Sequence, residues 1–217
     1  TLDNESVDNL RHYRGEGQQA AVRTALQSKP GSTIVVNLPT GAGKTLVAHS
    51  LCLFSPIEKL TLVIVPTIAL AIEQAQRAKE ILHEAGEETH NGYFFGGGQT
   101  PQQRQDIKDR VRSGQQRILF TSPESARGAL LPCLFDAAEG QLLANIVVDE
   151  AHIVDQWGDE FRPDFQIFAA VTKSLVRESK LTAKCLLLSA TFTDANLETL
   201  RNLFSSEGQD FFEVHSS

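Results

Sequence analysis

A glycine-rich stretch in the first quarter of the chain has the residue types needed to bind a phosphate. It reads Leu38-Pro39-Thr40-Gly41-Ala42-Gly43-Lys44-Thr45 and lies between an apolar run and a helix-like segment. Glycines let backbone N–H groups turn toward a phosphate, and the N-terminus of the following helix adds its dipole. Lys44 would reach the β- and γ-phosphates of a nucleotide, and the Thr45 hydroxyl would bind Mg²⁺. The strict pattern begins with glycine where this chain has Leu38, so a plain glycine-rich turn is the alternative.

A second candidate site, Asp149-Glu150-Ala151-His152, comes at the end of another apolar run. Asp149 would hold Mg²⁺ through water, Glu150 would orient and deprotonate the attacking water, and His152 could sense the γ-phosphate. Taken alone, an Asp-Glu pair is more often a solvated surface feature. The Ala-His continuation and the upstream loop favour the catalytic interpretation, with ATP and Mg²⁺ as cofactors.

The elements that must position these sites begin with short buried strands. Five apolar runs are rich in Val, Ile and Leu without clean alternation, which is typical of a parallel sheet covered on both faces. They are Thr33–Leu38, Leu60–Val65, Arg117–Thr121, Asn145–Asp149 and Lys184–Ser189, with Gly92–Phe95 and Phe211–His215 as weaker candidates.

Helix-like segments lie between the strands. In one of them Ile72, Ala75, Ala78 and Leu82 form an apolar stripe. Strands and helices in series imply right-handed crossovers and an α/β fold with a doubly wound, mainly parallel sheet and helices on both faces. Ligands of such sheets bind beyond the carboxyl ends of the strands, where both candidate sites lie. The predicted helices are Gln18–Leu26, Lys44–Phe54, Ile68–Glu84, Gln102–Arg112, Pro163–Arg177 and Asp194–Leu203.

The composition fits one large α/β domain over residues 1–217. The net charge of −7 argues against a protein that coats nucleic acid electrostatically, although a local basic track stays open. Cys52, Cys133 and Cys185 are widely spaced and are expected to be buried hydrophobes in a reducing compartment. No apolar run approaches the ~20 residues of a membrane helix, so we expect a cytoplasmic protein with no membrane partner.

The pair LPTGAGKT and DEAH resembles the ATP-binding motifs of superfamily 2 helicases and translocases. These proteins replace the first glycine of the phosphate loop freely, so Leu38 fits their pattern. The resemblance implies a RecA-like P-loop NTPase domain, the first of the two that such motors contain.

Three further segments resemble motifs of that family, in the family's order. Pro66-Thr67, in the run PTIAL, and Ser122-Pro123, in the run TSPE, would contact nucleic acid. Ser189-Ala190-Thr191 would link the ATP state to nucleic acid. The alternative for Thr67, Ser122, Ser189 and Thr191 is that each is a helix cap.

The sharpest resemblance follows the acidic site. Residues 153–165 read IVDQWGDEFRPDF and are similar to the aromatic-rich loop of RecQ-family DNA helicases. Trp157 and Phe161 offer flat faces for stacking on unpaired bases, each worth roughly 1–3 kcal/mol, and Arg162 can pair with a phosphate or stack. Ordering of this loop by single-stranded DNA would make hydrolysis depend on DNA. The alternative is that both rings pack under a loop.

A segment near the N-terminus, YRGEGQ, is similar to the FRPGQ segment with which RecQ helicases recognise adenine. The resemblance implies that Arg14 and Gln18 contact the base. This chain has one extra residue and lacks the proline, so either Gln18 or Gln19 is the contact. Gln18 is alternatively a polar residue at a helix N-terminus.

The resemblance implies an ATP-dependent DNA helicase that couples ATP hydrolysis to movement on single-stranded or partly duplex DNA, 3′ to 5′. Only 26 residues follow Thr191, and none resembles the motif that carries the arginine fingers, each worth about 10³–10⁵ in rate. We therefore expect the second RecA-like domain to be absent and the chain alone to be nearly inactive. The alternatives are a duplex translocase, an RNA-directed motor, or a nucleotide-sensing scaffold in a bacterial genome-defence complex.

Overall fold

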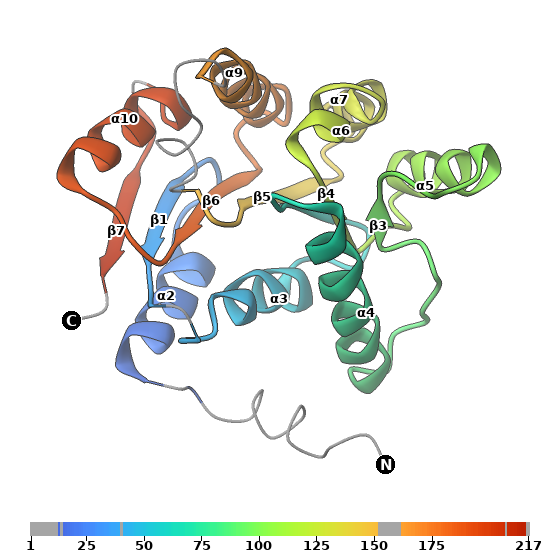
Figure 1. Ribbon diagram of the computed structural model, residues 1–217, viewed down its shortest axis with the longest axis horizontal. Coiled ribbons are helices and arrows are strands. Elements are labelled where there is room, and N and C mark those ends of the chain that lie inside the picture. Colours follow the sequence, from blue (N-terminus) through green and yellow to red (C-terminus); the bar gives the residue numbers. More distant parts are fainter. Residues whose placement is uncertain (1–12, 14, 40, 152–161, 207, 216–217) are drawn as a thin grey trace.

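A computed structural model describes residue 13 and residues 15–39, 41–151, 162–206 and 208–215. These residues form a three-layer α/β structure in which one sheet lies between two layers of helices (Figure 1). Within them, no helix is both long and apolar enough to cross a membrane. The strands are β1 (Thr33–Asn37), β2 (Leu60–Ile64), β3 (Phe94–Phe95), β4 (Ile118–Thr121), β5 (Leu143–Val148), β6 (Lys184–Ser189) and β7 (Phe211–His215).

The sheet has seven strands in the order β3-β4-β2-β5-β6-β1-β7, and every pair is parallel. The chain moves toward β3 first and then back toward β7. When the direction reverses, crossovers of one hand place their helices on the opposite face. The predicted doubly wound sheet is therefore confirmed.

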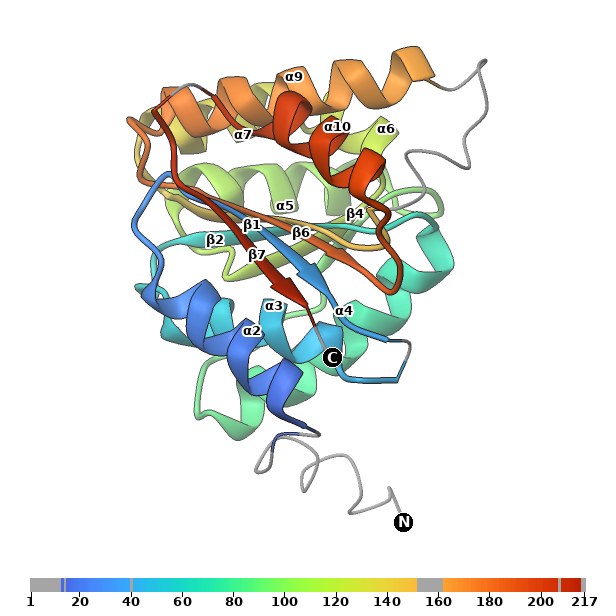
Figure 2. The same cartoon turned by 90° about the vertical axis from the view of Figure 1, so that its left-hand side faces the viewer.

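Figure 2 shows the two helical layers edge-on. The helices α2 (Glu16–Gln27), α3 (Lys44–Phe54) and α4 (Ile68–Glu84) cover one face. The other face is covered by α5 (Pro101–Ser113), α6 (Pro123–Arg127), α7 (Leu131–Glu139), α9 (Arg162–Glu178) and α10 (Asp194–Phe204).

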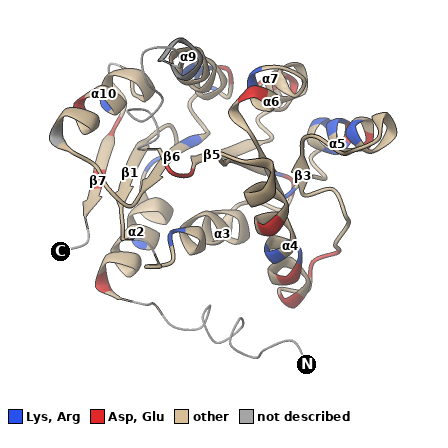
Figure 3. Cartoon of the chain, in the orientation of Figure 1, with Lys and Arg blue, Asp and Glu red and all other residues tan. Residues whose placement is uncertain are grey.

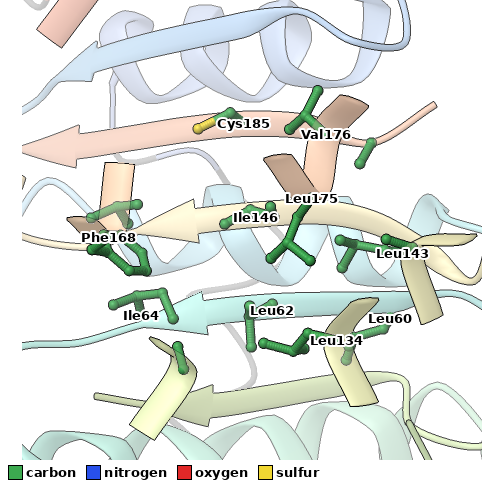
Figure 4. Close-up of a cluster of buried hydrophobic side chains, with 14 of the residues drawn as sticks. Leu60, Leu62, Ile64, Leu134, Leu143, Ile146, Phe168, Leu175, Val176 and Cys185 are labelled. Carbon is green, nitrogen blue, oxygen red and sulfur yellow. The ribbon is translucent and has the colours of Figure 1, made fainter. Parts of the chain in front are cut away.

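Successive strand residues point to opposite faces, so each strand contributes to two cores. Ile34, Val36 and Val63 belong to the cluster under α2, α3 and α4. Leu62, Ile64 and Ile146 belong to the cluster on the other face, where Leu134 of α7 and Phe168 of α9 pack against them (Figure 4). All three cysteines are buried and free, as expected, and burial raises the pKa of Cys52 and Cys185 to about 12.

The sequence analysis was wrong in two places. It predicted no helix between Ser122 and Leu143, where α6 and α7 lie. Helices this short are marginal alone and depend on packing, here through Leu134 and Ala137 of α7. In the stripe predicted on α4, Ala75, Ala78 and Leu82 are buried as predicted, but Ile72 is 46% exposed. Ala71, Gln74 and Ile81 complete the buried face of α4.

A buried imidazole in α3 predicts a pH-dependent stability. Burial, with the positive charge of Arg77, lowers the pKa of His49 from 6.5 to about 4. Between these pH values the unfolded chain binds the extra proton, so this contribution to stability is complete above pH 6.5 and falls as the pH drops toward 4.

We expect His49→Leu to remove that dependence. The loss between pH 7.5 and pH 5 corresponds to about 2 kcal/mol from His49. Thermal unfolding of the protein at both pH values measures it: the variant should lose less melting temperature on acidification than the wild type. His83→Leu, at an exposed site on α4, is the control. An equal acid shift in wild type and His49→Leu would contradict the buried neutral imidazole.

Candidate nucleotide-binding site

The phosphate loop joins the carboxyl end of β1 to the N-terminus of α3. Gly41 and Gly43 have φ angles of 82° and 78°, a region that glycine adopts without steric cost. Helix α3 begins at Lys44 without a side-chain cap. Leu46 N–H donates to the Gly43 carbonyl at 3.0 Å, but no side chain caps the helix, so an anion can approach its N-terminus, where the dipole favours negative charge.

The acidic site lies against the phosphate loop. Lys44 Nζ lies 3.7 Å from Glu150 Oε1 and donates to the carbonyl of Leu38 at 3.3 Å. Both charged side chains are largely withdrawn from water, with Lys44 9% and Glu150 29% exposed. Residues more than one hundred positions apart in the sequence thus meet beyond the carboxyl edge of the sheet.

The backbone after β5 is strained at the candidate catalytic base. Glu150 has a φ of 52°, a left-handed conformation that costs roughly 1–2 kcal/mol for a residue with a side chain. The turn is held by two hydrogen bonds: Glu150 N–H donates to Asp149 Oδ1 at 3.0 Å, and Asp149 N–H donates to the Ile64 carbonyl at 2.8 Å. Strain of this kind is concentrated at functional sites.

The carboxyl end of β6 connects the phosphate loop to the acidic site. Leu38 N–H donates to the Ser189 carbonyl at 2.9 Å, and Ala151 N–H donates to the Leu188 carbonyl at 2.8 Å. The Ser189 hydroxyl accepts from Thr191 N–H at 3.1 Å and donates to the Thr191 carbonyl at 3.0 Å. Leu188 and Ser189, at the carboxyl end of β6, thus contact the two halves of the site between them, whereas the cap of α10 is Thr193.

Helix α2 is joined to the phosphate loop by Gln18. The Gln18 side chain is buried, and its Nε2 donates to the carbonyl of Gly43 at 3.0 Å. Gln19 is only half-buried. The structure thus places Gln18, rather than Gln19, against the loop, while its contact with adenine stays a prediction.

A residue that the sequence analysis did not single out lies beside the predicted metal ligand. Gln74 of α4 is 8% exposed, and its Nε2 donates to Thr45 Oγ1 at 3.4 Å. The sequence signal is a polar residue at the spacing of buried alanines, Ala71, Ala75 and Ala78.

The predicted nucleic-acid segments follow adjacent strands. Pro66-Thr67 comes after β2 and Ser122-Pro123 after its neighbour β4. Thr67 and Ser122 cap α4 and α6, because their hydroxyls accept from Leu70 N–H and Ser125 N–H. Both hydroxyls therefore have a structural role, as the alternative held. Arg14, Thr40, His152, Trp157 and Phe161 lie outside the described residues, and Arg162 is described only as the first residue of α9.

Basic residues lie along α5 together with Asp106 and Asp109, near the β3 edge of the sheet (Figure 3). Several of them contact neighbouring residues of the fold. Arg104 donates to the Gly96 carbonyl and Arg110 to Gln116 Oε1, while Arg112 pairs with Asp136 at 2.7 Å. These three side chains thus contact residues around α5 and lie on a different element from the phosphate loop.

The residues at the carboxyl edge fit a magnesium nucleotide. The Lys44–Glu150 separation of 3.7 Å exceeds the 2.7–2.9 Å of a strong charge-assisted hydrogen bond, so phosphate oxygens would offer this cation better acceptors. The Thr45 hydroxyl and the Asp149 carboxylate are hard oxygen ligands of the kind Mg²⁺ takes, together with phosphates.

Comparison with known proteins identifies the family. Residues 16–200 match the family described as DEAD/DEAH box helicase. The chain is 30% identical to "ATP-dependent DNA helicase Q-like 5" of Arabidopsis thaliana, over 93% of this chain and 21% of the relative. It is 32% identical to "ATP-dependent DNA helicase RecQ" of Haemophilus influenzae, over 74% of this chain and 23% of the relative.

Solved structures agree with the fold. The structure of the DUF1998 helicase MrfA bound to DNA and AMPPNP superposes with a TM-score of 0.73 at 24% identity, over 98% of this chain and 29% of that one. The Mycobacterium smegmatis helicase Lhr gives 0.67 at 21% identity, over 98% and 27%. The chain thus spans less than a third of these proteins. With its matched segment and its conserved fold, this chain belongs to the DEAD/DEAH box helicase family and resembles the RecQ-like DNA helicases within it.

Proposed function

We propose that this chain is the ATP-binding domain of a RecQ-like DNA helicase that couples ATP hydrolysis to 3′-to-5′ movement along single-stranded DNA. The observation that carries the proposal is the approach of Lys44 to Glu150 at 3.7 Å, beyond the carboxyl edge of the sheet. The names of the relatives, ATP-dependent DNA helicases, support the same reaction. A second RecA-like domain of the same protein would supply the arginine fingers.

The chain's own residues would act in three steps. The α3 N-terminus and Lys44 would bind the phosphates, while Thr45 and Asp149 would hold Mg²⁺. Phosphate oxygens would draw the Lys44 ammonium away from the Glu150 carboxylate, leaving that carboxylate to orient the attacking water and accept its proton. Bound Mg²⁺ would neutralise charge on the phosphates.

Nucleotide state would be transmitted through β6. Ser189 is bonded to Leu38 and the preceding Leu188 to Ala151, so a shift on either side of the site would be passed to Ser189-Ala190-Thr191. Single-stranded DNA that contacts Pro66-Thr67 and Ser122-Pro123 would cross the carboxyl ends of β2 and β4, which are neighbours in the sheet. Trp157, Phe161 and Arg162 would stack on its bases or pair with its phosphates.

The activating nucleic acid tests the proposal. We expect single-stranded DNA to stimulate ATP hydrolysis by the full-length protein more than duplex DNA or RNA does. Trp157→Ala should weaken single-stranded DNA binding by roughly tenfold, the loss of one base stack. Steady-state ATPase assays with the three activators, and fluorescence anisotropy with labelled oligonucleotides, measure both effects.

The other outcomes identify the other motors. Stimulation by duplex DNA alone would indicate a duplex translocase, and stimulation by RNA alone an RNA-directed motor. Unwinding of tailed substrates, with the tail at either end, reports the polarity. A full-length protein with no nucleic-acid-stimulated turnover would contradict the helicase proposal and favour a nucleotide-sensing scaffold.

A further inference from the structure

We propose that Gln74 is a positioning residue for the metal ion, holding the Thr45 hydroxyl in the orientation that binds Mg²⁺. The proposal rests on the ATPase function proposed above and adds a residue from outside the phosphate loop and the acidic site. Gln74 reaches the site from α4, about two turns after the helix begins at Ile68.

Two observations on the amide carry the proposal. Its Nε2 donates to Thr45 Oγ1 at 3.4 Å. Its Oε1 is buried and has no hydrogen-bond partner among the described residues. A buried amide oxygen without a partner costs about 1–3 kcal/mol. Gln74 Oε1 is therefore able to accept a hydrogen bond, and it belongs to the same amide that contacts the Thr45 hydroxyl.

The hydroxyl chemistry explains why such an acceptor is useful. A threonine hydroxyl has one proton to donate and two lone pairs to offer. When a cation takes one lone pair, the hydroxyl becomes a stronger donor and needs an acceptor for its proton. A half-turn of the Gln74 amide would place Oε1 where Nε2 now lies. The same side chain can thus hold the Thr45 oxygen before metal binding and accept its proton afterward.

The position in the fold suits this role. α3, which carries Thr45, and α4, which carries Gln74, lie in the same helical layer (Figure 1). Ala71, Ala75 and Ala78 bury the rest of the α4 face, so the amide is the polar group of an otherwise apolar surface. Removing a side chain that orients a metal ligand typically lowers metal affinity 10- to 100-fold.

Gln74→Met removes both hydrogen-bonding atoms while keeping the length of the side chain. In the full-length protein we expect it to weaken binding of Mn²⁺, used as a paramagnetic substitute for Mg²⁺, by about 10-fold in the presence of AMPPNP. Electron paramagnetic resonance measures free Mn²⁺ directly. Affinity for a fluorescent ATP analogue in EDTA should stay within about twofold, because the phosphate-binding backbone is untouched.

Two variants accompany it. Gln76→Met is the control on the same helix, where an exposed amide donates to Glu80 Oε1; it should leave Mn²⁺ affinity unchanged. Gln74→Glu keeps an acceptor for the Thr45 proton, and we expect it to restore most of the Mn²⁺ affinity lost in Gln74→Met.

The outcomes separate this inference from the proposed function. Wild-type Mn²⁺ affinity in Gln74→Met would overturn it, as would an equal loss of nucleotide binding in EDTA, which indicates a distorted loop. If Gln74→Met does not fold, Gln74→Glu decides, and a Mn²⁺ affinity as poor as that of Thr45→Ala would overturn the inference. If the wild-type protein bound neither AMPPNP nor Mn²⁺ in the presence of AMPPNP, the ATPase site itself would be refuted.

Discussion

Glu150→Gln is expected to lower kcat for ATP hydrolysis by the full-length protein by about 10²- to 10⁴-fold, the range for loss of a general base. Glutamine keeps the shape of the side chain and its place 3.7 Å from Lys44, but it cannot accept the water proton. Nucleotide affinity should be retained, because the change removes a carboxylate that competes with the phosphates for Lys44. Single-turnover hydrolysis and equilibrium binding of a fluorescent ATP analogue separate the two effects.

The controls distinguish chemistry from folding. Glu139→Gln changes an exposed carboxylate at the end of α7 and should leave both constants unchanged. Lys44→Ala should lose nucleotide affinity as well as turnover, because it removes the cation that faces the phosphates. If Glu150→Gln hydrolysed ATP at the wild-type rate, Glu150 would not be the base. If it lost activity without any biological effect, hydrolysis would be dispensable.

The largest expected effect on stability comes from the end of the sheet opposite the nucleotide site, where β4 begins. Arg117, just before β4, forms a bidentate pair with Glu87 at 2.8 and 3.1 Å and donates to the carbonyls of Cys52 and Pro56 at 2.9 and 2.7 Å. Arg117 is 8% and Glu87 17% exposed. Removing one partner of a buried pair leaves an uncompensated charge, so we expect Arg117→Met to cost about 3–5 kcal/mol.

Native-state hydrogen exchange of the β4 amides measures that loss, because these amides report the opening free energy of the core. Arg112→Met is the matched control, since the Arg112–Asp136 pair is equally short at 2.7 Å but its side chains are 39% and 53% exposed. It should cost less than about 1 kcal/mol. Equal losses in the free energy of unfolding for the two variants would show that burial does not determine how much these ion pairs stabilise the protein.

Much of the fold could be predicted from the sequence because its main strands are short, continuous apolar runs. Runs such as Leu60–Ile64 and Lys184–Ser189 have apolar residues on both faces, which is typical of a parallel sheet covered on both sides. The placement of the phosphate loop after β1 and of the acidic site after β5 then follows from the rule for carboxyl ends. Helices as short as α6 and α7 are marginal alone and form through tertiary packing, so their sequences did not predict them.

The details of the site depend on tertiary geometry that no local pattern encodes. The left-handed turn at Glu150 has no signal in a residue type that normally avoids it. Gln74 meets Thr45 only because α3 and α4 lie in one layer. Thr67 and Ser122 matched nucleic-acid motifs and also cap helices, so residue type alone could not separate the two roles.

The site as a whole is tested most directly by locating the metal. A crystal structure of the full-length protein with AMPPNP and Mn²⁺, using anomalous scattering, should place one Mn²⁺ at bonding distance from Thr45 Oγ1. Lys44 Nζ should contact the β- and γ-phosphates, and the Asp149 carboxylate should face the ion through water. A nucleotide bound elsewhere, or a Mn²⁺ peak remote from both Thr45 and Asp149, would show that these residues do not form a magnesium–triphosphate site.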